Sequence, residues 1–222
     1  MLYQWGRKDA FPGADGSTIT QETSANNAQT IPMYGATDNE LAEGSEEGLQ
    51  LIDVTTSGVI GNNNTSFTYA IKHPLTFIYN ILSLRDWYTN DQQYQNDVLW
   101  TRKDNKSNYD PCPEGWRMPL DNTWNDFTLE TAHYHTQGNL TSLGDNSATN
   151  GLLYKDFAWY SACGYRNAGT GNGGLRSVGY GGNYWSSTPS TRFNFNPVNG
   201  VYPNYKPDEA RAAGLTVRCI QE

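Results

Sequence analysis

The sequence predicts a single α+β domain of short strands and long loops that spans residues 1–222. Glycine contributes 22 of the 222 residues and charged side chains only 17%, unlike the Ala, Glu, Lys and Leu excess of helical proteins. Aromatic residues reach 13%, with 15 Tyr and 7 Trp, and we expect their rings to pack between small sheets. Neither an internal repeat nor a linker divides the chain, so one domain is expected.

Strands are predicted at both ends of the chain, over residues 2–7 and 214–220, and we expect them to pair and close the fold. In the polar N-terminal third, residues 49–54 give the clearest strand and residues 66–69 a shorter one. An apolar segment follows at residues 73–79, where a proline sets the entry of the chain.

The C-terminal half is predicted to hold one helix followed by strands and loops. Residues 120–127 form the helix, because Asp121 can cap its first turn. Residues 151–182 are rich in glycine and alternate strands with loops, and residues 184–188 form a further strand. A long loop, residues 189–213, then leads to the last strand.

Three cysteines, Cys112, Cys163 and Cys219, limit the possible redox chemistry. Cys112 lies in a proline-braced turn and Cys219 in the terminal strand, so we expect a disulfide between them and a buried free thiol at Cys163. The alternative is three reduced core thiols, as in a cytosolic protein. No C-x-x-C pair occurs in the sequence, so we expect no structural zinc site.

The charge of the chain argues against several partners. A formal net charge of −8 offers no basic stripe for nucleic acid and disfavours an anionic membrane surface. The sequence has no run of about 18 apolar residues, so we expect no membrane insertion by this chain. Its start lacks the apolar centre of a signal peptide, and we expect the mature or C-terminal part of a longer protein.

Catalytic and metal-binding candidates are few, and the sequence predicts no enzyme, no cofactor and no metal. Adjacent carboxylates at residues 46–47 and 208–209 usually point apart, so they form no acid/base pair. His133 and His135 share a face only on a strand, whereas their segment follows the predicted helix, and no third ligand is evident. Oxygen-rich segments leave a calcium site open but unplaced, since none has the spacing of a known loop. Their oxygen-bearing residues are Asn90, Asp91, Asn96, Asp97, Asp104, Asn108 and Asp110.

Residues 189–213 are the main candidate for a binding site because they are dense in Asn, Tyr and Phe. Flat rings and amides suit recognition at a modest cost in side-chain entropy, and Arg192 can bind an acidic sugar or a carboxylate. The alternative is an ordinary loop that packs its own rings. The expected ligand-binding residues are Tyr180, Tyr184, Arg192, Phe193, Asn194, Asn196, Asn199, Tyr202, Asn204 and Tyr205.

Several short motifs follow one another in a characteristic order. Three of them are Pro-Cys-Pro-Glu-Gly-Trp-Arg-Met-Pro at 111–119, Tyr-Trp-Ser-Ser-Thr at 184–188 and Val-Arg-Cys at 217–219, and others lie at 3–9, 73–78, 99–100 and 164–166. Together they resemble the fimbrillin-family surface proteins of gut-type Bacteroidetes, in particular their C-terminal FISUMP-type (major paralogous) domain. The motifs are also similar to the C-terminal domain of bacterial collagen-like adhesins and, more distantly, to formylglycine-generating enzymes. Those enzymes need a second Cys close to Cys219, which this chain lacks.

The resemblance implies a C-type lectin-like fold: small antiparallel sheets closed by paired termini, two short helices, and a long loop region that carries the binding site. It also implies an extracellular location, at the bacterial cell surface or a pilus tip. Some C-type lectin-like proteins have their last segment rewritten by diversity-generating retroelements, and residues 194–205 are similar to such a region. The expected fixed frame is the disulfide together with Trp5, Trp116, Trp124 and Trp185.

The sequence therefore predicts a non-catalytic adhesin that recognises a glycan or protein ligand. Two alternatives stay open. One is a structural module of a pilus or surface assembly, whose partners are pilus subunits. The other is a divergent carbohydrate-active enzyme, which needs two carboxyl groups about 5–10 Å apart.

Overall fold

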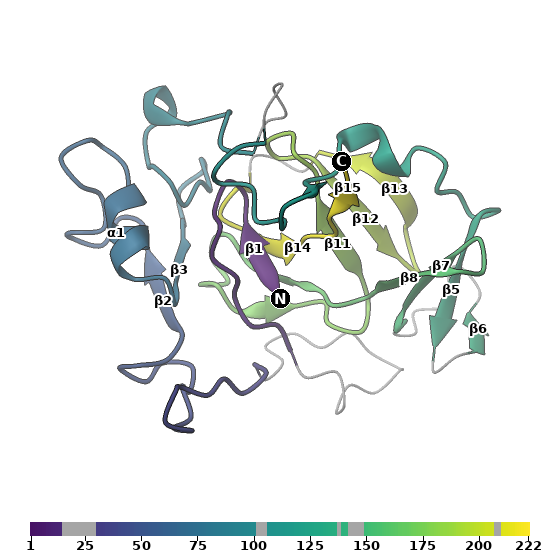
Figure 1. The fold of residues 1–222 in the computed structure, drawn as a ribbon, viewed down its shortest axis with the longest axis horizontal. Helices are drawn as coiled ribbons and strands as arrows, with labels where there is room; N and C mark the ends of the chain where they lie inside the picture. The colour runs from purple at the N-terminus through teal and green to yellow at the C-terminus, as the bar shows by residue number, and fades with distance from the viewer. Residues whose placement is uncertain (15–29, 101–105, 137–138, 142–148, 207–209) are drawn as a thin grey trace.

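Small, mainly antiparallel sheets account for most of the regular structure, together with one α-helix and short 3-10 turns among the described residues (Figure 1). This confirms the prediction of short strands with little helix. The structure is a computed structural model that describes residues 1–14, 30–100, 106–136, 139–141, 149–206 and 210–222.

A seven-stranded sheet forms the centre of the molecule, with the order β10-β9-β14-β11-β12-β13 and with β1 also paired to β14 (Figure 1). β1 and β14 run antiparallel, with Leu2 opposite Thr216, which confirms the predicted pairing of the chain ends. The strands are β1 (Leu2–Gln4), β9 (Tyr165–Arg166), β10 (Leu175–Arg176), β11 (Gly182–Trp185), β12 (Arg192–Asn196), β13 (Gly200–Tyr205) and β14 (Gly214–Thr216).

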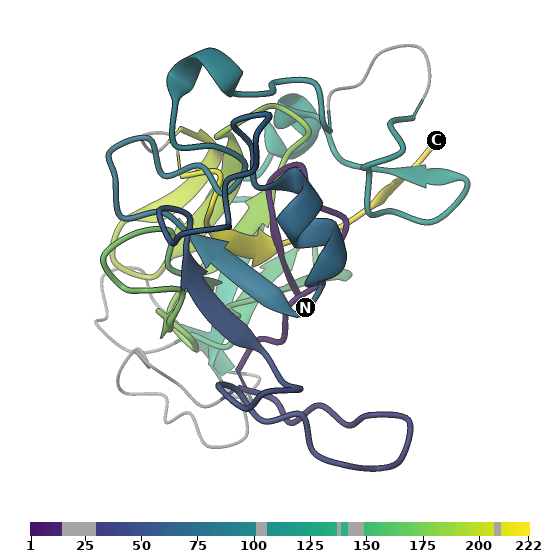
Figure 2. The same ribbon diagram turned by 90° about the vertical axis from the view of Figure 1, so that its left-hand side faces the viewer.

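A parallel pair of strands, β2 (Gln50–Asp53) and β3 (Thr76–Tyr79), lies on one side of the central sheet together with α1 (Phe67–Lys72), in the foreground of Figure 2. The strand expected at residues 66–69 is wrong, because this segment enters α1. Parallel strands need a crossover connection, and a helix is its usual form. α1 provides that connection between β2 and β3, and buries Ala70.

A four-stranded antiparallel sheet with the order β6-β5-β7-β8 lies on the other side (Figure 1). The helix predicted at 120–127 is only a short 3-10 turn, η3 (Asp121–Trp124). Asp121 does not cap it, because Asp121 is the first residue of the turn and Leu120 holds the N-cap position. The Asp121 carboxylate instead accepts a hydrogen bond from the Thr188 hydroxyl at 2.7 Å. The remaining elements on this side and at the top of the molecule are β5 (Ala132–Thr136), β6 (Asn139–Thr141), β7 (Gly151–Tyr154), β8 (Ala158–Ser161) and η2 (Gln92–Tyr94).

The two larger of four hydrophobic clusters among the described residues form the main cores, beside the central sheet. The first core faces α1 and β3, and it includes four fully buried tryptophans, Trp5, Trp87, Trp100 and Trp185. The second core joins the central sheet to the four-stranded sheet, and it includes ten buried residues: Trp124, Phe127, Ala132, Tyr134, Leu152, Tyr160, Ala162, Tyr184, Phe193 and Phe195. Burying one such large apolar side chain contributes about 1.5–3 kcal/mol.

The expected tryptophan frame is only partly correct. Trp5, Trp124 and Trp185 are at most 1% exposed, whereas Trp116 is 44% exposed. Trp116 lies on β4 (Trp116–Arg117), which pairs only with the last strand, β15 (Ile220–Gln221), at the edge of the molecule. The motif around Trp116 therefore does not place its ring in the core.

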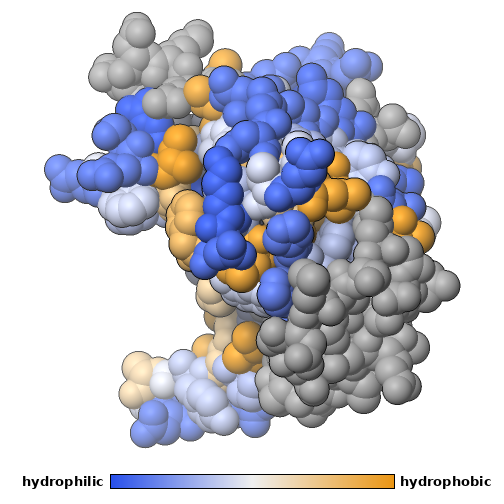
Figure 3. All heavy atoms as spheres, turned by 90° about the vertical axis from the view of Figure 1, so that its right-hand side faces the viewer, coloured by the Kyte–Doolittle hydropathy of each residue, from blue (hydrophilic) through white to orange (hydrophobic). Residues whose placement is uncertain are grey.

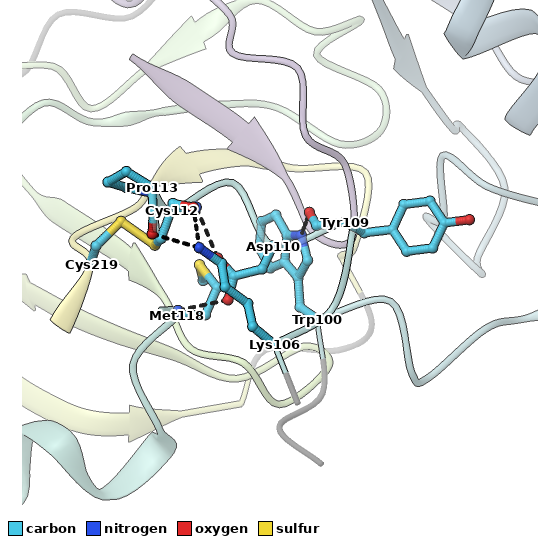
Figure 4. The surroundings of a disulfide bond; sticks show 8 residues. All are labelled: Trp100, Lys106, Tyr109, Asp110, Cys112, Pro113, Met118 and Cys219. Atoms are coloured by element: carbon cyan, nitrogen blue, oxygen red, sulfur yellow. Dashed lines mark hydrogen bonds between the residues drawn. A yellow bond between two sulfur atoms is a disulfide. The ribbon is translucent and has the colours of Figure 1, made fainter. Parts of the chain in front are cut away.

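A disulfide joins Cys112 to Cys219, as predicted, with the two Cα atoms 5.7 Å apart (Figure 4). Asp110 braces the turn that holds Cys112, because its two carboxylate oxygens accept the amide protons of Cys112 at 2.8 Å and Met118 at 3.0 Å. The bond spans 107 residues, and in the loop-entropy model such a crosslink stabilises the fold by about 4–5 kcal/mol. Cys163 is the free cysteine: part of the residue is exposed, while its thiol lies 2.8 Å from the Thr216 hydroxyl and burial raises the pKa of this thiol.

Candidate functional site

Residues 189–213, expected to be a long loop, contain a β-hairpin instead. Strands β12 and β13 pair antiparallel at one edge of the central sheet, with Asn196 opposite Gly200. The loop prediction is wrong because the segment from Arg192 to Asn196 alternates polar and apolar side chains, which is the pattern of a half-buried strand. The Asn, Pro and Gly residues that favoured a loop form the turn of the hairpin.

Alternation along β12 sorts its side chains between two faces of the sheet. Phe193 and Phe195 are fully buried in the second core. Arg192, Asn194 and Asn196 lie on the opposite face and are half-buried. The hairpin therefore presents a polar surface while its other face holds the core together.

A β-bulge brings two tyrosines onto this polar face. Arg192 is opposite Tyr205 and Asn194 is opposite Tyr202, so β13 has one residue more than β12 between these pairs. The extra residue lets two side chains three positions apart face the same way, and the ring centroids of Tyr202 and Tyr205 are 5.7 Å apart. Pro203 lies inside the bulge, on an edge strand that can accommodate a missing amide proton.

The turn of the hairpin is built around an asparagine. The Asn196 side-chain oxygen accepts the amide protons of Val198 at 3.2 Å and Asn199 at 2.7 Å. Gly200 then adopts a φ of +102°, a conformation that favours glycine. The Tyr202 hydroxyl donates to the Asn199 carbonyl at 2.7 Å, so the ring is anchored across the turn.

The polar face of the hairpin and the segment before β11 bound an open cleft of about 410 Å³. We call it the Tyr/Asn cleft. Four tyrosines, four asparagines and one arginine dominate its wall, and none of the described residues that line it is a carboxylate. Its lining residues are Tyr165, Ser177, Tyr180, Gly181, Asn183, Arg192, Asn194, Asn196, Asn199, Tyr202 and Tyr205.

Seven of the ten expected contact residues line this cleft: Tyr180, Arg192, Asn194, Asn196, Asn199, Tyr202 and Tyr205. Tyr184 and Phe193 do not, because they are buried in the second core, and neither is on an accessible surface. Asn204 is exposed but lines a separate hollow with Asp121 and Asn122. The structure therefore brings seven of the ten residues together in one hollow and places the other three elsewhere.

Four lining residues, Tyr165, Ser177, Gly181 and Asn183, were not expected from the sequence. Tyr165 comes from β9, which is joined to β11 through β14. Asn183 is opposite Asn194 in the β11–β12 register, and its side-chain oxygen accepts from the Asn194 amide at 2.9 Å. The period-2 pattern of β11 was the available signal for Asn183, because it places this residue on the face opposite Tyr184.

Arg192 is the charged group of the cleft. Its guanidinium carbon lies 5.1 Å from the centroid of the Tyr205 ring, a cation–π distance. Its buried Nε has no hydrogen-bond partner among the described residues. Burial away from water lowers the pKa of Arg192 to about 10, while the nearby Tyr205 and Tyr165 act in the opposite direction. The side chain therefore remains charged at neutral pH.

A second hollow of about 340 Å³ continues from the Tyr/Asn cleft. Both share Tyr165, Arg192 and Tyr205 as lining residues. The second hollow adds the basic side chains of Arg85 and Lys206. Arg192 thus lines both hollows, and the other basic side chains, Arg85 and Lys206, line the second one.

Several of the calcium candidates use side-chain oxygens in contacts within the fold. Asp110 accepts two amide protons beside the disulfide, and Asp97 forms an ion pair with Arg211 at 2.6 Å. Asp91 caps η2 by accepting the Gln93 amide proton at 3.0 Å. No group of three or more His, Cys, Asp or Glu side chains within the described ranges is arranged to hold a metal ion.

His133 and His135 lie on β5 and not in a segment after a helix, so they do share one face of a strand. The calcium candidate Asp104 and the adjacent pair Asp208 and Glu209 lie outside the described residues.

The face with the four-stranded sheet shows hydrophobic residues as several patches between hydrophilic ones (Figure 3). Exposed rings outside the cleft include Phe157, which is 75% exposed, and Trp159 on β8, which is 41% exposed. The Tyr/Asn cleft differs from these rings because its aromatic residues occur together with amides in a hollow.

Comparison of the chain with protein-family models, with curated proteins and with solved structures gives no match. Within the described part of the chain, every helix is too short or too polar to serve as a transmembrane span.

Proposed function

We propose that this chain is a non-catalytic adhesin domain of C-type lectin-like fold that binds a glycan in the Tyr/Asn cleft. The observation that carries the proposal is the convergence of seven residues, selected from the sequence for recognition chemistry, on one open hollow. A volume of about 410 Å³ lies within the usual range of small-ligand sites, about 300–1,000 Å³.

The chemistry of the cleft supports a sugar ligand. Sugars combine apolar C–H faces with many hydroxyl groups, so they need flat rings and groups that both donate and accept hydrogen bonds. Tyrosine rings offer the flat apolar surface, and each asparagine amide offers two donors and an acceptor. The carbohydrate-active enzyme alternative would need two carboxyl groups in this space, and the described lining residues offer amides, hydroxyls and a guanidinium instead.

The disulfide supports a location in an oxidising compartment, where such bonds persist. The motif resemblance extends this to a bacterial cell surface or pilus tip. In the alternative of a structural pilus module, the same surface would contact other subunits. That alternative predicts binding to a pilus subunit and to no glycan.

The hairpin also suits a region diversified by a retroelement, which we propose for residues 194–205. Its cleft-facing Asn194 and Asn196 alternate with the core residue Phe195, so the surface can change while the core residue is kept. Sequencing the gene beside a matching template repeat tests this. Adenine-directed differences at the cleft-facing codons support it, and their absence removes it.

A binding screen with matched tyrosine variants tests the proposed function. We expect the purified domain to bind members of a glycan array, and Tyr202→Ala to reduce that binding about tenfold or more, because stacked-ring contacts at a site centre are worth about 1–3 kcal/mol. Tyr94→Ala is the control, since Tyr94 is 37% exposed and Tyr202 38% exposed, and Tyr94 lies on η2 outside the cleft. Equal binding by the two variants would contradict the proposal.

A further inference from the structure

We propose that the ligand of the Tyr/Asn cleft is an acidic oligosaccharide, and that Arg192 binds its anionic group. This inference rests on the proposed function of the cleft and names its ligand class. It starts from a guanidinium in the cleft wall for which the described residues provide no counter-charge.

Arg192, which is half-buried, differs in its partners from the three buried arginines, Arg7, Arg166 and Arg211. Arg7 is paired with Asp9 at 2.7 Å, Arg166 with Glu43 at 3.0 Å and Arg211 with Asp97 at 2.6 Å. No ion pair of Arg192 occurs among the described residues, and its buried Nε has no hydrogen-bond partner there. The guanidinium of Arg192 lies over the Tyr205 ring but contacts no described carboxylate, so a ligand that supplies an anionic acceptor gains a charge-assisted hydrogen bond at this point.

The charges around Arg192 favour an anion. None of the described residues that line the cleft is acidic, and the adjoining hollow adds Arg85 and Lys206. The chain as a whole has a formal net charge of −8. A cleft whose described lining carries only positive charge focuses a positive potential, so this part of the surface is expected to attract an anion.

The geometry favours a sugar acid over an acidic protein. A stable protein partner usually covers about 800 Å² on each side with some 20–30 residues, whereas the cleft is lined by 11 residues around about 410 Å³. A guanidinium presents a planar fork of N–H donors that matches the oxygens of a carboxylate or a sulfate ester. The four tyrosines leave room for neighbouring sugar rings to pack beside that contact.

The test uses acidic oligosaccharides printed in pairs with neutral counterparts. Uronate and sialate probes are paired with their carboxyl-reduced forms, and sulfated probes with their desulfated forms. We expect the domain to bind at least one acidic probe and to lose about ten- to hundredfold in affinity for its neutral counterpart, the range for one charge-assisted hydrogen bond. The carboxylated and sulfated arms identify which anionic group is recognised.

Two substitutions assign the effect to Arg192. Arg192→Gln should reduce affinity for the acidic probe by the same ten- to hundredfold factor. Arg192→Lys should cause a smaller loss of affinity, because the positive charge remains and only the planar set of guanidinium N–H donors is lost. Lys72→Gln removes one positive charge from α1, far from the cleft, and should leave affinity unchanged. Thermal unfolding of each variant is measured as well, so that affinities are compared only between folded domains.

The outcomes separate this inference from the proposed function. Equal binding of acidic and neutral probes, or full affinity in Arg192→Gln, with binding still reduced by Tyr202→Ala, overturns the inference and leaves the proposed function standing. Binding that is insensitive to Tyr202→Ala overturns both. Selective binding of an acidic probe that is lost in both Arg192→Gln and Tyr202→Ala supports both.

Discussion

Trp185 and Trp116 occur in two motifs that the sequence presents as equivalent parts of a core, and the structure places them differently. Trp185 is fully buried, and its indole Nε1 donates to the Tyr3 carbonyl at 2.8 Å, which ties β11 to β1. Trp116 is 44% exposed. The presence of a tryptophan in a sequence motif therefore does not predict how deeply its ring is buried.

Replacing the two tryptophans should therefore have unequal effects. Trp185→Ala is expected to lower the free energy of unfolding by about 3–5 kcal/mol, because a large cavity remains and the Tyr3 carbonyl loses its partner. Trp116→Ala should cost about 1 kcal/mol or less. Urea unfolding of both variants measures the difference. Equal losses of unfolding free energy in the two variants would contradict the difference in burial between Trp185 and Trp116.

At the scale of single residues, sequence reasoning identified chemistry better than orientation. Arg192 and Asn194 line the cleft as expected, whereas the intervening Phe193 is in the core. A segment interpreted as a loop has no regular alternation of side chains, so residues that face the cleft could not be distinguished from neighbours that face the core. The disulfide between Cys112 and Cys219 was predictable because one cysteine lies in a proline-braced turn and the other in the terminal segment.

At the scale of elements, the β12–β13 hairpin shows how two signals in one segment compete. The alternation in β12 indicates a strand, and the Asn196, Pro197 and Gly200 that follow indicate a turn. Read together they predict a hairpin, but the density of turn residues favoured a loop. α1 was missed for a different reason, because its helical form follows from the crossover between β2 and β3.

The packing of the two larger sheets against each other also buries tyrosines, and the ionisation of these tyrosines should affect the stability of the fold at high pH. Burial away from water raises the pKa of Tyr134, Tyr160 and Tyr184 above the ordinary value of 10.0. The unfolded chain loses these protons near pH 10, whereas the folded chain retains them. Their contribution to stability is therefore fully present below pH 10 and is lost as the pH rises above it.

We expect the free energy of unfolding to fall above pH 10 by about 1.4 kcal/mol per pH unit for each tyrosine that only the folded state keeps protonated. Tyr184→Phe should reduce this slope, because it removes one of the buried hydroxyls. Urea unfolding between pH 8 and 11.5 gives the slopes. An unchanged slope in Tyr184→Phe would contradict the burial of its hydroxyl.

At the scale of the whole molecule, the cleft depends on pairings between distant parts of the chain. The pairing of β1 with β14 was predictable, because both are apolar segments at the chain ends. The position of Tyr165 beside the hairpin was not, since it follows from β9 and β11 both pairing with β14. Such long-range order is set by the packing of both cores and has no local sequence signal.

The central claim is that the Tyr/Asn cleft is the ligand site, and a hydrogen–deuterium exchange footprint tests it most directly. The domain is compared with and without a glycan selected on the array. The account predicts slowed exchange in residues 177–183 and along β12 and β13, with α1 and the four-stranded sheet unchanged. Slowed exchange confined to α1 or to the four-stranded sheet would contradict it.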